Sequence, residues 1–183
     1  MSGPVFLDGD GVALCPADQS DLNFLRTHEN DPRVRKTRTV RFPTSTDHAT
    51  TRLGGTMGRN EETVGLVIRA DDESVGFVYL LREDPNAIDF RYAELAYWIA
   101  YEHWDAGYAT AAAKTMVKYG FDELGLHRIT ASTLASNESS KRVLEKVGFE
   151  REGVAREEVY TDGEWHDRIR YGLLADEWRA DNS

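Results

Sequence analysis

Residues 97–121 read YWIAYEHWDAGYATAAAKTMVKYGF, and this stretch decides the fold. An apolar, aromatic segment passes through a short loop with one glycine, Gly107, directly into an alanine-rich run. In that run small and apolar residues recur at three-to-four spacing, which predicts an amphipathic helix. A strand that turns tightly into a helix points free backbone N–H groups at one place, and the helix dipole adds about half a positive charge there. The stretch is therefore suited to bind an anion such as a pyrophosphate, although a glycine is also common at helix starts that bind none.

The elements expected on either side of this stretch alternate between strands and helices. Apolar runs with short-range alternation predict seven strands, and runs with helical periodicity predict four helices. Ser20 and Asn137 are suited to cap the first and last of these helices, and Gly148 to end the last one. Helices inserted between strands predict a mixed sheet with helices on both faces. The expected strands are residues 11–14, 63–70, 74–82, 93–100, 127–134, 151–161 and 164–174, and the expected helices are 20–30, 45–55, 109–124 and 138–147.

The length and the cysteine count limit the classes of protein to which this chain can belong. The 183 residues suffice for one domain with a buried core, which we expect to span residues 1–183. No run approaches about 18 uninterrupted apolar residues, and the N-terminus lacks the basic and apolar regions of a signal peptide. The single cysteine, Cys15, excludes an internal disulfide and fits a reducing compartment. The sequence therefore predicts a soluble, cytoplasmic protein without a membrane partner or a metal site.

The charge balance excludes one further class. Asp and Glu number 32 against 22 Lys and Arg, which gives a net charge of −10. Broad binding to nucleic acid needs a basic surface, so nucleic acid is not an expected partner. Only five of the basic residues are lysine. Acidity with few lysines fits a surface adapted to high salt and equally fits an ordinary acidic protein, and the sequence leaves both interpretations open.

The region around the opening stretch resembles a known family. Residues 93–154 read AELAYWIAYEHWDAGYATAAAKTMVKYGFDELGLHRITASTLASNESSKRVLEKVGFEREGV. This run resembles the GNAT superfamily of acetyl-coenzyme A-dependent N-acetyltransferases, and within it the ribosomal-protein-alanine (Rim-type, RimJ/RimL) branch. The resemblance extends from residue 11 to residue 178 and is most specific over 94–153. It implies the α/β GNAT fold, a mixed and mostly antiparallel seven-stranded sheet flanked by about four helices, with acetyl-CoA as cosubstrate.

The loop at the start of the long helix carries the most specific part of the resemblance. In the family this loop follows the pattern R/Q-x-x-G-x-G/A and wraps the pyrophosphate of the coenzyme. Trp104 replaces the general Arg or Gln, although Trp fits this branch, and Asp105 replaces a glycine. A carboxylate beside a phosphate weakens binding unless it points to solvent, but the backbone donors are unaffected by the change. The loop residues implied to bind the coenzyme are Trp104, Asp105, Ala106, Gly107, Tyr108, Ala109 and Thr110.

Residues outside the loop are implied to complete the coenzyme site. Backbone N–H groups at Trp98, Ile99 and Ala100 would hold the thioester carbonyl and the pantetheine amides. Asn137 would lie beside the pantetheine arm as well as cap its helix. Ser140 would lie near the sulfur and donate a proton or a hydrogen bond to the departing thiolate. The alternative for Ser140 is a small residue that packs at the helix start.

Two further positions bear on proton transfer. Many family members place a general-acid tyrosine seven residues after the helix-capping Asn, and this chain has Leu144 there. Glu94 opens the strand 93–100 and by alternation shares a face with Ala96 and Trp98. A carboxylate on such a face is either an edge charge that reaches water or a base with a raised pKa. The resemblance makes Glu94 a candidate general base, acting directly or through water.

The expected reaction is direct attack of an amine on the acetyl thioester in a ternary complex, without an acyl-enzyme. An α-amino group has a pKa near 7.8, so roughly a seventh is neutral at pH 7. A lysine, with a pKa near 10.4, is neutral in roughly one molecule in 2,500. A site without the tyrosine acid is therefore better suited to a protein or peptide N-terminus.

Several alternatives stay open. The chain also fits a GNAT enzyme for a small-molecule amine. A third possibility is a non-catalytic acyl-CoA-binding module, which is compatible with Asp105 in the loop and with Leu144 in place of the tyrosine acid. The basic segment 33–41 fits an acidic acceptor, a coenzyme phosphate or a solvated loop, and counts against a polyamine acceptor. The last hairpin offers aromatic candidates for the acceptor channel or, by analogy with dimeric relatives, for a homodimer contact, although core packing explains two of them equally well. These hairpin residues are Tyr160, Trp165 and His166.

Overall fold

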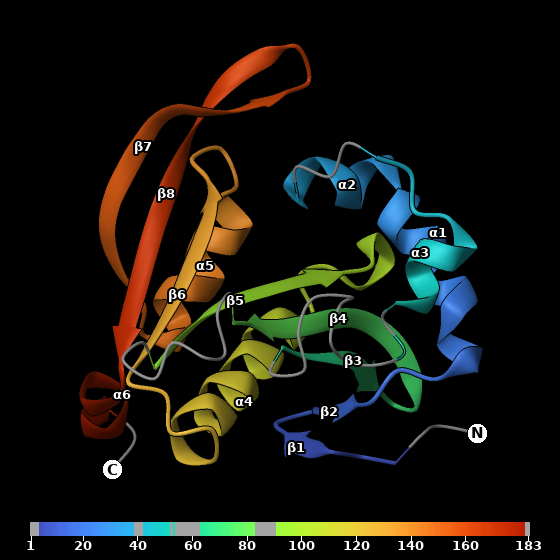
Figure 1. Ribbon diagram of the computed structural model, residues 1–183, viewed down its shortest axis with the longest axis horizontal. Helices are drawn as coiled ribbons and strands as arrows, with labels where there is room; N and C mark the ends of the chain where they lie inside the picture. Colours follow the sequence, from blue (N-terminus) through green and yellow to red (C-terminus); the bar gives the residue numbers. More distant parts are fainter. Residues whose placement is uncertain (1–3, 39–41, 52, 54–62, 83–90, 182–183) are drawn as a thin grey trace.

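The sheet of this protein has eight strands, and their order determines where a site can form. The computed structural model describes residues 4–38, 42–51, 53, 63–82 and 91–181. Within these residues the strand order is β1-β2-β3-β4-β5-β6-β8-β7, and β5 and β6 are the parallel pair in an otherwise antiparallel sheet (Figure 1). The mixed, mostly antiparallel GNAT-like sheet expected from the sequence is confirmed.

The strands are β1 (Leu7–Gly9), β2 (Val12–Cys15), β3 (Val64–Ala70), β4 (Glu73–Leu81), β5 (Tyr92–Ile99), β6 (Arg128–Leu134), β7 (Glu150–Thr161) and β8 (Glu164–Leu174). The helices are α1 (Leu22–Asn30), α2 (Pro32–Arg38), α3 (Thr46–Thr50), α4 (Tyr108–Asp122), α5 (Glu138–Val147) and α6 (Ala175–Asp181), with the short 3-10 helices η1 (Gln19–Asp21) and η2 (Tyr101–His103). In the described part of the chain, no helix combines the length and the apolarity that crossing a membrane requires.

The expected seven strands and four helices omit β1, α2 and α6. β1 is short and forms a hairpin with β2 around Gly11, which lies in the left-handed region at φ 72°. α2 begins at Pro32, whose fixed φ suits the first helical position. The Asp31 carboxylate accepts the backbone N–H of Arg33 at 2.8 Å and so satisfies one of the free donors there. The residues that end α1 therefore also start α2.

The caps of the early helices differ in part from the prediction. The expected cap Ser20 is itself capped, because Asp18 accepts its backbone N–H at 2.7 Å. The Asp21 carboxylate in turn accepts the backbone N–H of Asp18 at 3.0 Å, which completes a capping box. Ser45 caps α3, which ends at Thr50, so the predicted helix is shorter than 45–55. Residues 52, 54 and 55 of that prediction lie outside the described residues.

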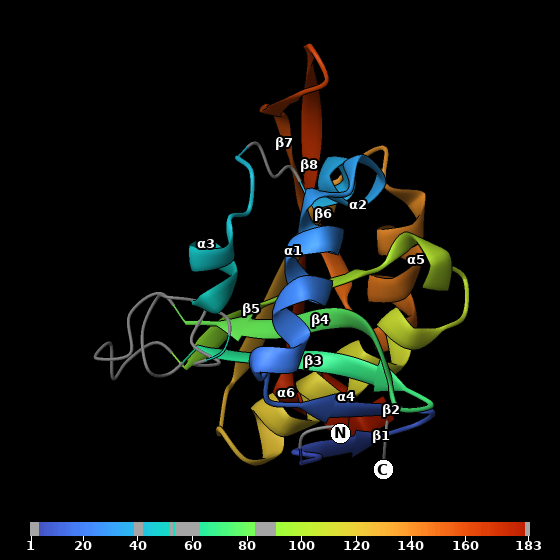
Figure 2. The same cartoon turned by 90° about the vertical axis from the view of Figure 1, so that its right-hand side faces the viewer.

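Two hydrophobic clusters cover the two faces of the sheet. The larger cluster packs α4, α5 and α6 against one face, with Met116, Leu144 and Trp178 among its buried residues. The smaller cluster packs α1 and α2 against the other face around Leu25 and Val34. Figures 1 and 2 show α2 and α4 on opposite sides of β4 and β5. Any opening through the sheet therefore connects two different surfaces.

Such an opening arises between β5 and β6. The two strands pair at three positions, from Tyr92↔Arg128 to Glu94↔Thr130, although β5 continues to Ile99 and β6 to Leu134. Beyond Glu94 they diverge, as Figure 1 shows. The second half of β5 therefore has one edge paired with β4 and one edge free.

Candidate active site

A pocket of about 720 Å³ lies where β5 and β6 separate. On the α4–α5 face it is lined by the loop before α4 and by residues that include Tyr97, Asn137 and Ser140. On the α1–α2 face its lining includes Arg38 and Glu94. One pocket is thus reached from both faces of the sheet.

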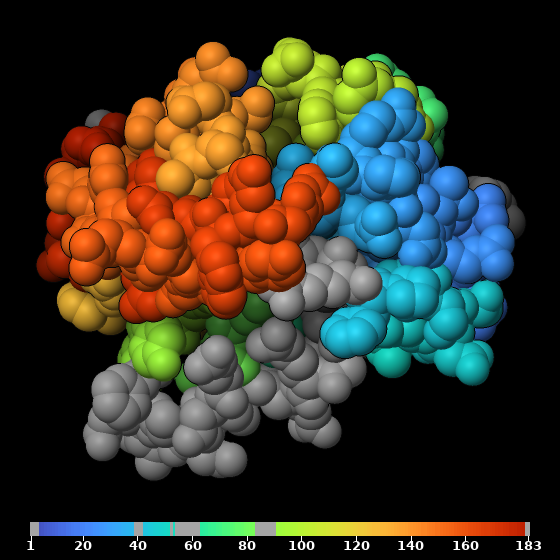
Figure 3. Space-filling model, turned by 90° about the horizontal axis from the view of Figure 1, so that it is seen from above, coloured from blue at the N-terminus to red at the C-terminus, as the bar shows by residue number. Residues whose placement is uncertain are grey.

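The hairpin of β7 and β8 borders the α1–α2 side of this region. Seen from above, the hairpin lies against α2 (Figure 3). The contact includes an ion pair in which Lys36 Nζ lies 3.1 Å from Asp162 Oδ2. Tyr160 and Trp165 pack on each other near the tip, with ring centroids 5.2 Å apart, and neither they nor His166 line the pocket. These three residues are therefore not brought to the site.

The loop before α4 has the geometry of an anion site. Gly107 occupies the N-cap position with φ 87°, a left-handed conformation that glycine adopts without strain. Asp105 is also left-handed at φ 62°, which Asp tolerates better than most residues, and its side chain is exposed. Trp104 Nε1 donates to the carbonyl oxygen of Ile99 at 2.8 Å and ties the loop to the end of β5. Trp104 thus anchors the loop to β5, and Asp105 adopts the left-handed backbone conformation that the loop requires.

The N–H groups of this loop are free of protein acceptors. The amides of Thr110 and Ala111 donate to the carbonyl oxygen of Gly107 at 3.0 and 3.1 Å. Within the described residues, the five amides of residues 105–109 have no such partner. Five successive unpaired donors at the positive end of a 15-residue helix are suited to a phosphate group, and all of their residues except Ala106 line the pocket.

The amides of β5 divide between the sheet and the pocket. Ala100 donates to the Val75 carbonyl at 2.9 Å, so its N–H is not available to a ligand, contrary to the expectation. Because strand amides alternate in direction, the amide of Trp98 also faces β4, and those of Tyr97 and Ile99 face the free edge. The β4–β5 pairing runs from Gly76↔Ile99 to Leu81↔Glu94 without a register shift. The divergence of β6 therefore exposes these donors.

The side chain of Trp98 lines the pocket from the α1–α2 face. It is 3% exposed and stacks on Phe24 at a centroid separation of 5.6 Å. The Arg38 guanidinium lies 5.5 Å from the centroid of its ring. Trp98 is thus a packing residue of the α1–α2 face. Of the three β5 residues expected to bind the coenzyme, Ile99 alone presents an amide to the free edge.

Tyr97 joins Ser140 on the α4–α5 face. Asn137 caps α5 as predicted, since its side chain accepts the backbone N–H of Ser140 at 3.1 Å. The hydroxyl of Ser140 lies 3.1 Å from that of Tyr97. Burial raises the pKa of Tyr97 to about 12, against a smaller lowering by the bond to Ser140. Leu144 is buried in the core, so the phenol in this site comes from β5 and not from α5.

Tyr97 was not among the site residues predicted from the sequence, although a signal for it was present. Alternation places Tyr97 on the face opposite Glu94 and Trp98, which is the face that α5 covers. The capping of α5 by Asn137 then places Ser140 in its first turn, near the strand. Recognising the contact required knowing that α5 packs beside β5, which periodicity does not reveal.

Glu94 lies at the point where the two strands begin to separate. Its Oε1 accepts a hydrogen bond from the Ser132 hydroxyl of β6 at 3.0 Å. It shares the α1–α2 face with Trp98, as predicted, and Arg38 and Arg168 line the same side of the pocket. Glu94 and Ser140 therefore line one pocket from opposite faces of the sheet.

Residues 12–150 match the family described as the acetyltransferase (GNAT) domain. The chain belongs to the GNAT family. It is 42% identical over 91 residues to the putative ribosomal N-acetyltransferase YdaF of Bacillus subtilis, a match that covers 50% of each chain.

Other relatives of this GNAT chain point to different acceptors. Spermidine N(1)-acetyltransferase of Escherichia coli K12 is 30% identical over 116 residues, which cover 63% of this chain and 61% of that protein. The first curated relatives are thus matched over about half to two thirds of their length. A crystal structure of spermidine N-acetyltransferase from Vibrio cholerae in complex with CoA and spermine has a TM-score of 0.81 at 24% identity, covering 92% of this chain and 98% of that one, which shows the shared fold.

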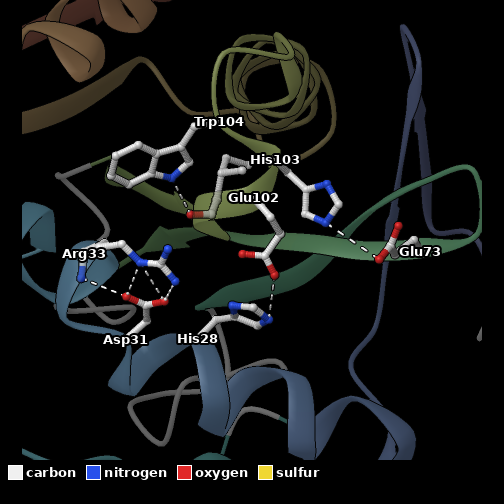
Figure 4. A network of polar contacts seen from close by, with 8 residues as sticks. His28, Asp31, Arg33, Glu73, Glu102, His103 and Trp104 are labelled. Atoms are coloured by element: carbon white, nitrogen blue, oxygen red, sulfur yellow. Dashed lines mark hydrogen bonds and ion pairs between the residues drawn. The ribbon is translucent and has the colours of Figure 1, made fainter.

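A network of polar contacts holds η2, the segment that leads into the loop before α4 of this GNAT chain (Figure 4). Glu102 lies 3.5 Å from His28 of α1, and His103 lies 3.8 Å from Glu73 of β4. The Arg33 guanidinium stacks on the ring of Tyr101 at 3.9 Å. The loop is therefore fixed from both α1–α2 and the sheet.

Contacts with carboxylates account for three of the basic side chains in the segment 33–41. Arg33 is paired with Asp31, Lys36 with Asp162, and Arg38 lies 3.7 Å from Glu29. Residues 39–41 of this segment lie outside the described residues. Within the described residues, no group of three or more His, Cys, Asp or Glu side chains is placed to hold a metal ion.

We predict that Gly107→Ala weakens acetyl-CoA binding. An alanine in the left-handed region costs about 1–2 kcal/mol, which disfavours the loop conformation in which the amides are free. Gly163, in the β7–β8 turn, has the same φ of 87° and the same open surroundings, so Gly163→Ala is a matched control. Both variants should lose similar stability to urea, but only Gly107→Ala should raise the calorimetric Kd for acetyl-CoA, by about tenfold. Equal Kd values for the two variants would contradict the role of the loop.

Proposed function

We propose that this chain is an N-acetyltransferase that transfers an acetyl group from acetyl-CoA to the N-terminal α-amine of a protein or peptide. The proposal has direct attack of the amine on the thioester in a ternary complex. Its main support is the single pocket that opens on both faces of the sheet. The coenzyme can occupy the α4–α5 side while the amine approaches from the α1–α2 side.

The residues of the α4–α5 face fit the coenzyme. The free amides of residues 105–109 would bind its pyrophosphate, and the edge amides of Tyr97 and Ile99 would receive the pantetheine arm and the thioester carbonyl. Bound in this way, acetyl-CoA supplies an activated acyl group. Donors already fixed along β5 stabilise the negative charge that develops on the carbonyl oxygen without reorganisation.

Tyr97 and Ser140 are suited to assist the leaving group. As the C–N bond forms and the C–S bond breaks, negative charge collects on the sulfur. The pKa of Tyr97, about 12, lies far above that of a thiol, about 8.5. The phenol therefore stays protonated and donates a hydrogen bond to the thiolate, with the Ser140 hydroxyl beside it.

Glu94 is the candidate acceptor of the amine proton. It is fixed by Ser132 at 3.0 Å and lines the pocket on the side from which the amine would approach. Since roughly a seventh of an α-amine is neutral at pH 7, the base needs only to remove the proton after attack. Glu94 can do this directly or through one water molecule.

The charges of the α1–α2 side favour a peptide over a polyamine. That side of the pocket is lined by two guanidinium groups, Arg38 and Arg168, and one carboxylate, Glu94. The two guanidinium groups have carboxylate partners that do not line the pocket, Glu29 at 3.7 Å and Glu158 at 3.4 Å. A polyamine carries several positive charges and needs several carboxylates, whereas peptide carbonyl and carboxylate groups accept hydrogen bonds from guanidinium. A free amino acid offers the same groups and is the alternative acceptor.

The acceptor preference is testable with matched substrates. Thiol release from acetyl-CoA should be measured with a lysine-free peptide that has a free N-terminus, the same peptide blocked at its N-terminus and carrying one lysine, a free amino acid, and spermidine. We expect kcat/KM for the free N-terminus to exceed that for the blocked peptide and spermidine by at least about tenfold, in line with the neutral fractions. Faster turnover of spermidine or of the blocked peptide would reject this preference, and binding without release on any amine would favour a non-catalytic module.

A second experiment tests the leaving-group assignment. Tyr97→Phe should lower kcat by about tenfold, because one hydrogen bond to a charged group is lost, and should leave the Kd for acetyl-CoA nearly unchanged. Tyr119→Phe, which removes a half-buried phenol on α4 outside the pocket, should change neither value.

The pH dependence provides a further check on the same residue. The folded-state pKa of Tyr97 is raised, so the phenol is protonated at every pH well below 12. Wild-type kcat should therefore not fall between about pH 7 and pH 10 through loss of this proton. A fall in that range that Tyr97→Phe abolishes would contradict the assignment.

A further inference from the structure

Two exposed cations on α5 face the pocket without an acidic partner. Arg142 and Lys146 both line it. In the described part of the chain, neither side chain forms an ion pair or a hydrogen bond. Lys141 beside them differs, since it donates to the Ala135 carbonyl and pairs with Glu138. In a chain of net charge −10, two unpaired cations directed at one pocket favour an anionic ligand.

The spacing of the two residues suits one phosphate group. Positions i and i+4 lie on the same helix face with Cβ atoms about 5–6 Å apart. Val143, between them in sequence, lines the same pocket. A guanidinium can bind a phosphate through two parallel N–H groups, while an ammonium contributes a point charge.

Their place along α5 indicates which phosphate they can reach. Ser140 marks the thiol end of the proposed coenzyme site. Lys146 lies six residues further along α5, or about 9 Å along the helix axis, in the direction away from that end. The five free amides of residues 105–109 already account for the pyrophosphate. Coenzyme A carries one more phosphate, the 3′-phosphate of its ribose.

We propose that Arg142 and Lys146 bind the 3′-phosphate of coenzyme A, an inference that rests on the proposed use of acetyl-CoA. The pair gives the site selectivity for the complete coenzyme over acyl carriers that lack this phosphate. A phosphate monoester carries close to two negative charges at neutral pH, and the two cations neutralise it locally in an otherwise acidic protein.

The test compares acetyl-CoA with 3′-dephospho-acetyl-CoA by calorimetry, which requires no acceptor and no turnover. The double variant Arg142→Gln/Lys146→Gln removes the pair. Lys114→Gln/Lys118→Gln removes two exposed cations of α4 that lie outside the pocket and so changes the net charge equally. Thermal unfolding checks that all variants fold.

We expect the wild type and the α4 control to bind acetyl-CoA at least about tenfold more tightly than the dephospho form. The α5 double variant should lose this preference through a weaker Kd for acetyl-CoA alone, and its Kd for the dephospho form should stay within about twofold of the wild-type value. At high salt the wild-type preference should shrink, because exposed charge pairs are screened.

Three results would overturn the proposal: no preference in the wild type, a preference that survives in the α5 double variant, or an equal loss of affinity for both coenzymes. Failure of the acceptor assignment leaves the Kd ratio unaffected. Absence of binding of either coenzyme by the wild type would overturn the coenzyme assignment itself, and this proposal with it. The two failures are therefore distinguishable.

Discussion

The three-residue pairing of β5 with β6 is the constraint on which the rest of the site depends. On its other edge β5 pairs with β4 from Glu94 to Ile99, and β6 pairs with β8 along its whole length. β5 therefore follows β4, β6 follows β8, and the two strands stay apart beyond Glu94. The free amides of β5, the pocket and its access from both faces all follow from this divergence.

Local donors, and not the overall charge of −10, suit the loop before α4 to an anion. At physiological salt, charges separated by more than about 8 Å are largely screened. The exposed carboxylates therefore repel a bound coenzyme weakly, and the free amides of residues 105–109 act at contact distance. Asp105 is the acidic residue within the loop, and its exposed side chain and left-handed backbone are compatible with this arrangement.

The sequence predicted the features that depend on neighbouring residues. The loop glycine at 107, the Asn137 cap and the Gly148 end of α5 are local, and each is found where expected. Seven strands were recognised by their apolar runs. α2 was missed because a short run of charged residues shows no helical periodicity, and its start depends on the Asp31–Pro32 cap.

Features that depend on strand partners were not predictable in this way. The amide of Ala100 was expected in the site, but its direction is set by Val75 on the neighbouring strand. Tyr97 was overlooked because its partner, Ser140, is 43 residues away in sequence. Arg38 and Arg168 line the same pocket, but they come from α2 and β8 and meet only in the folded chain.

Amide-resolved hydrogen exchange with and without acetyl-CoA tests the central claim most directly. If β5 and the loop before α4 hold the coenzyme through their free backbone donors, its addition should slow exchange at Tyr97, Ile99 and residues 105–109. The amide of Ala100, already bonded within the sheet, should change little. Protection that leaves residues 105–109 unaffected, or that falls on the α1–α2 face instead, would contradict the account.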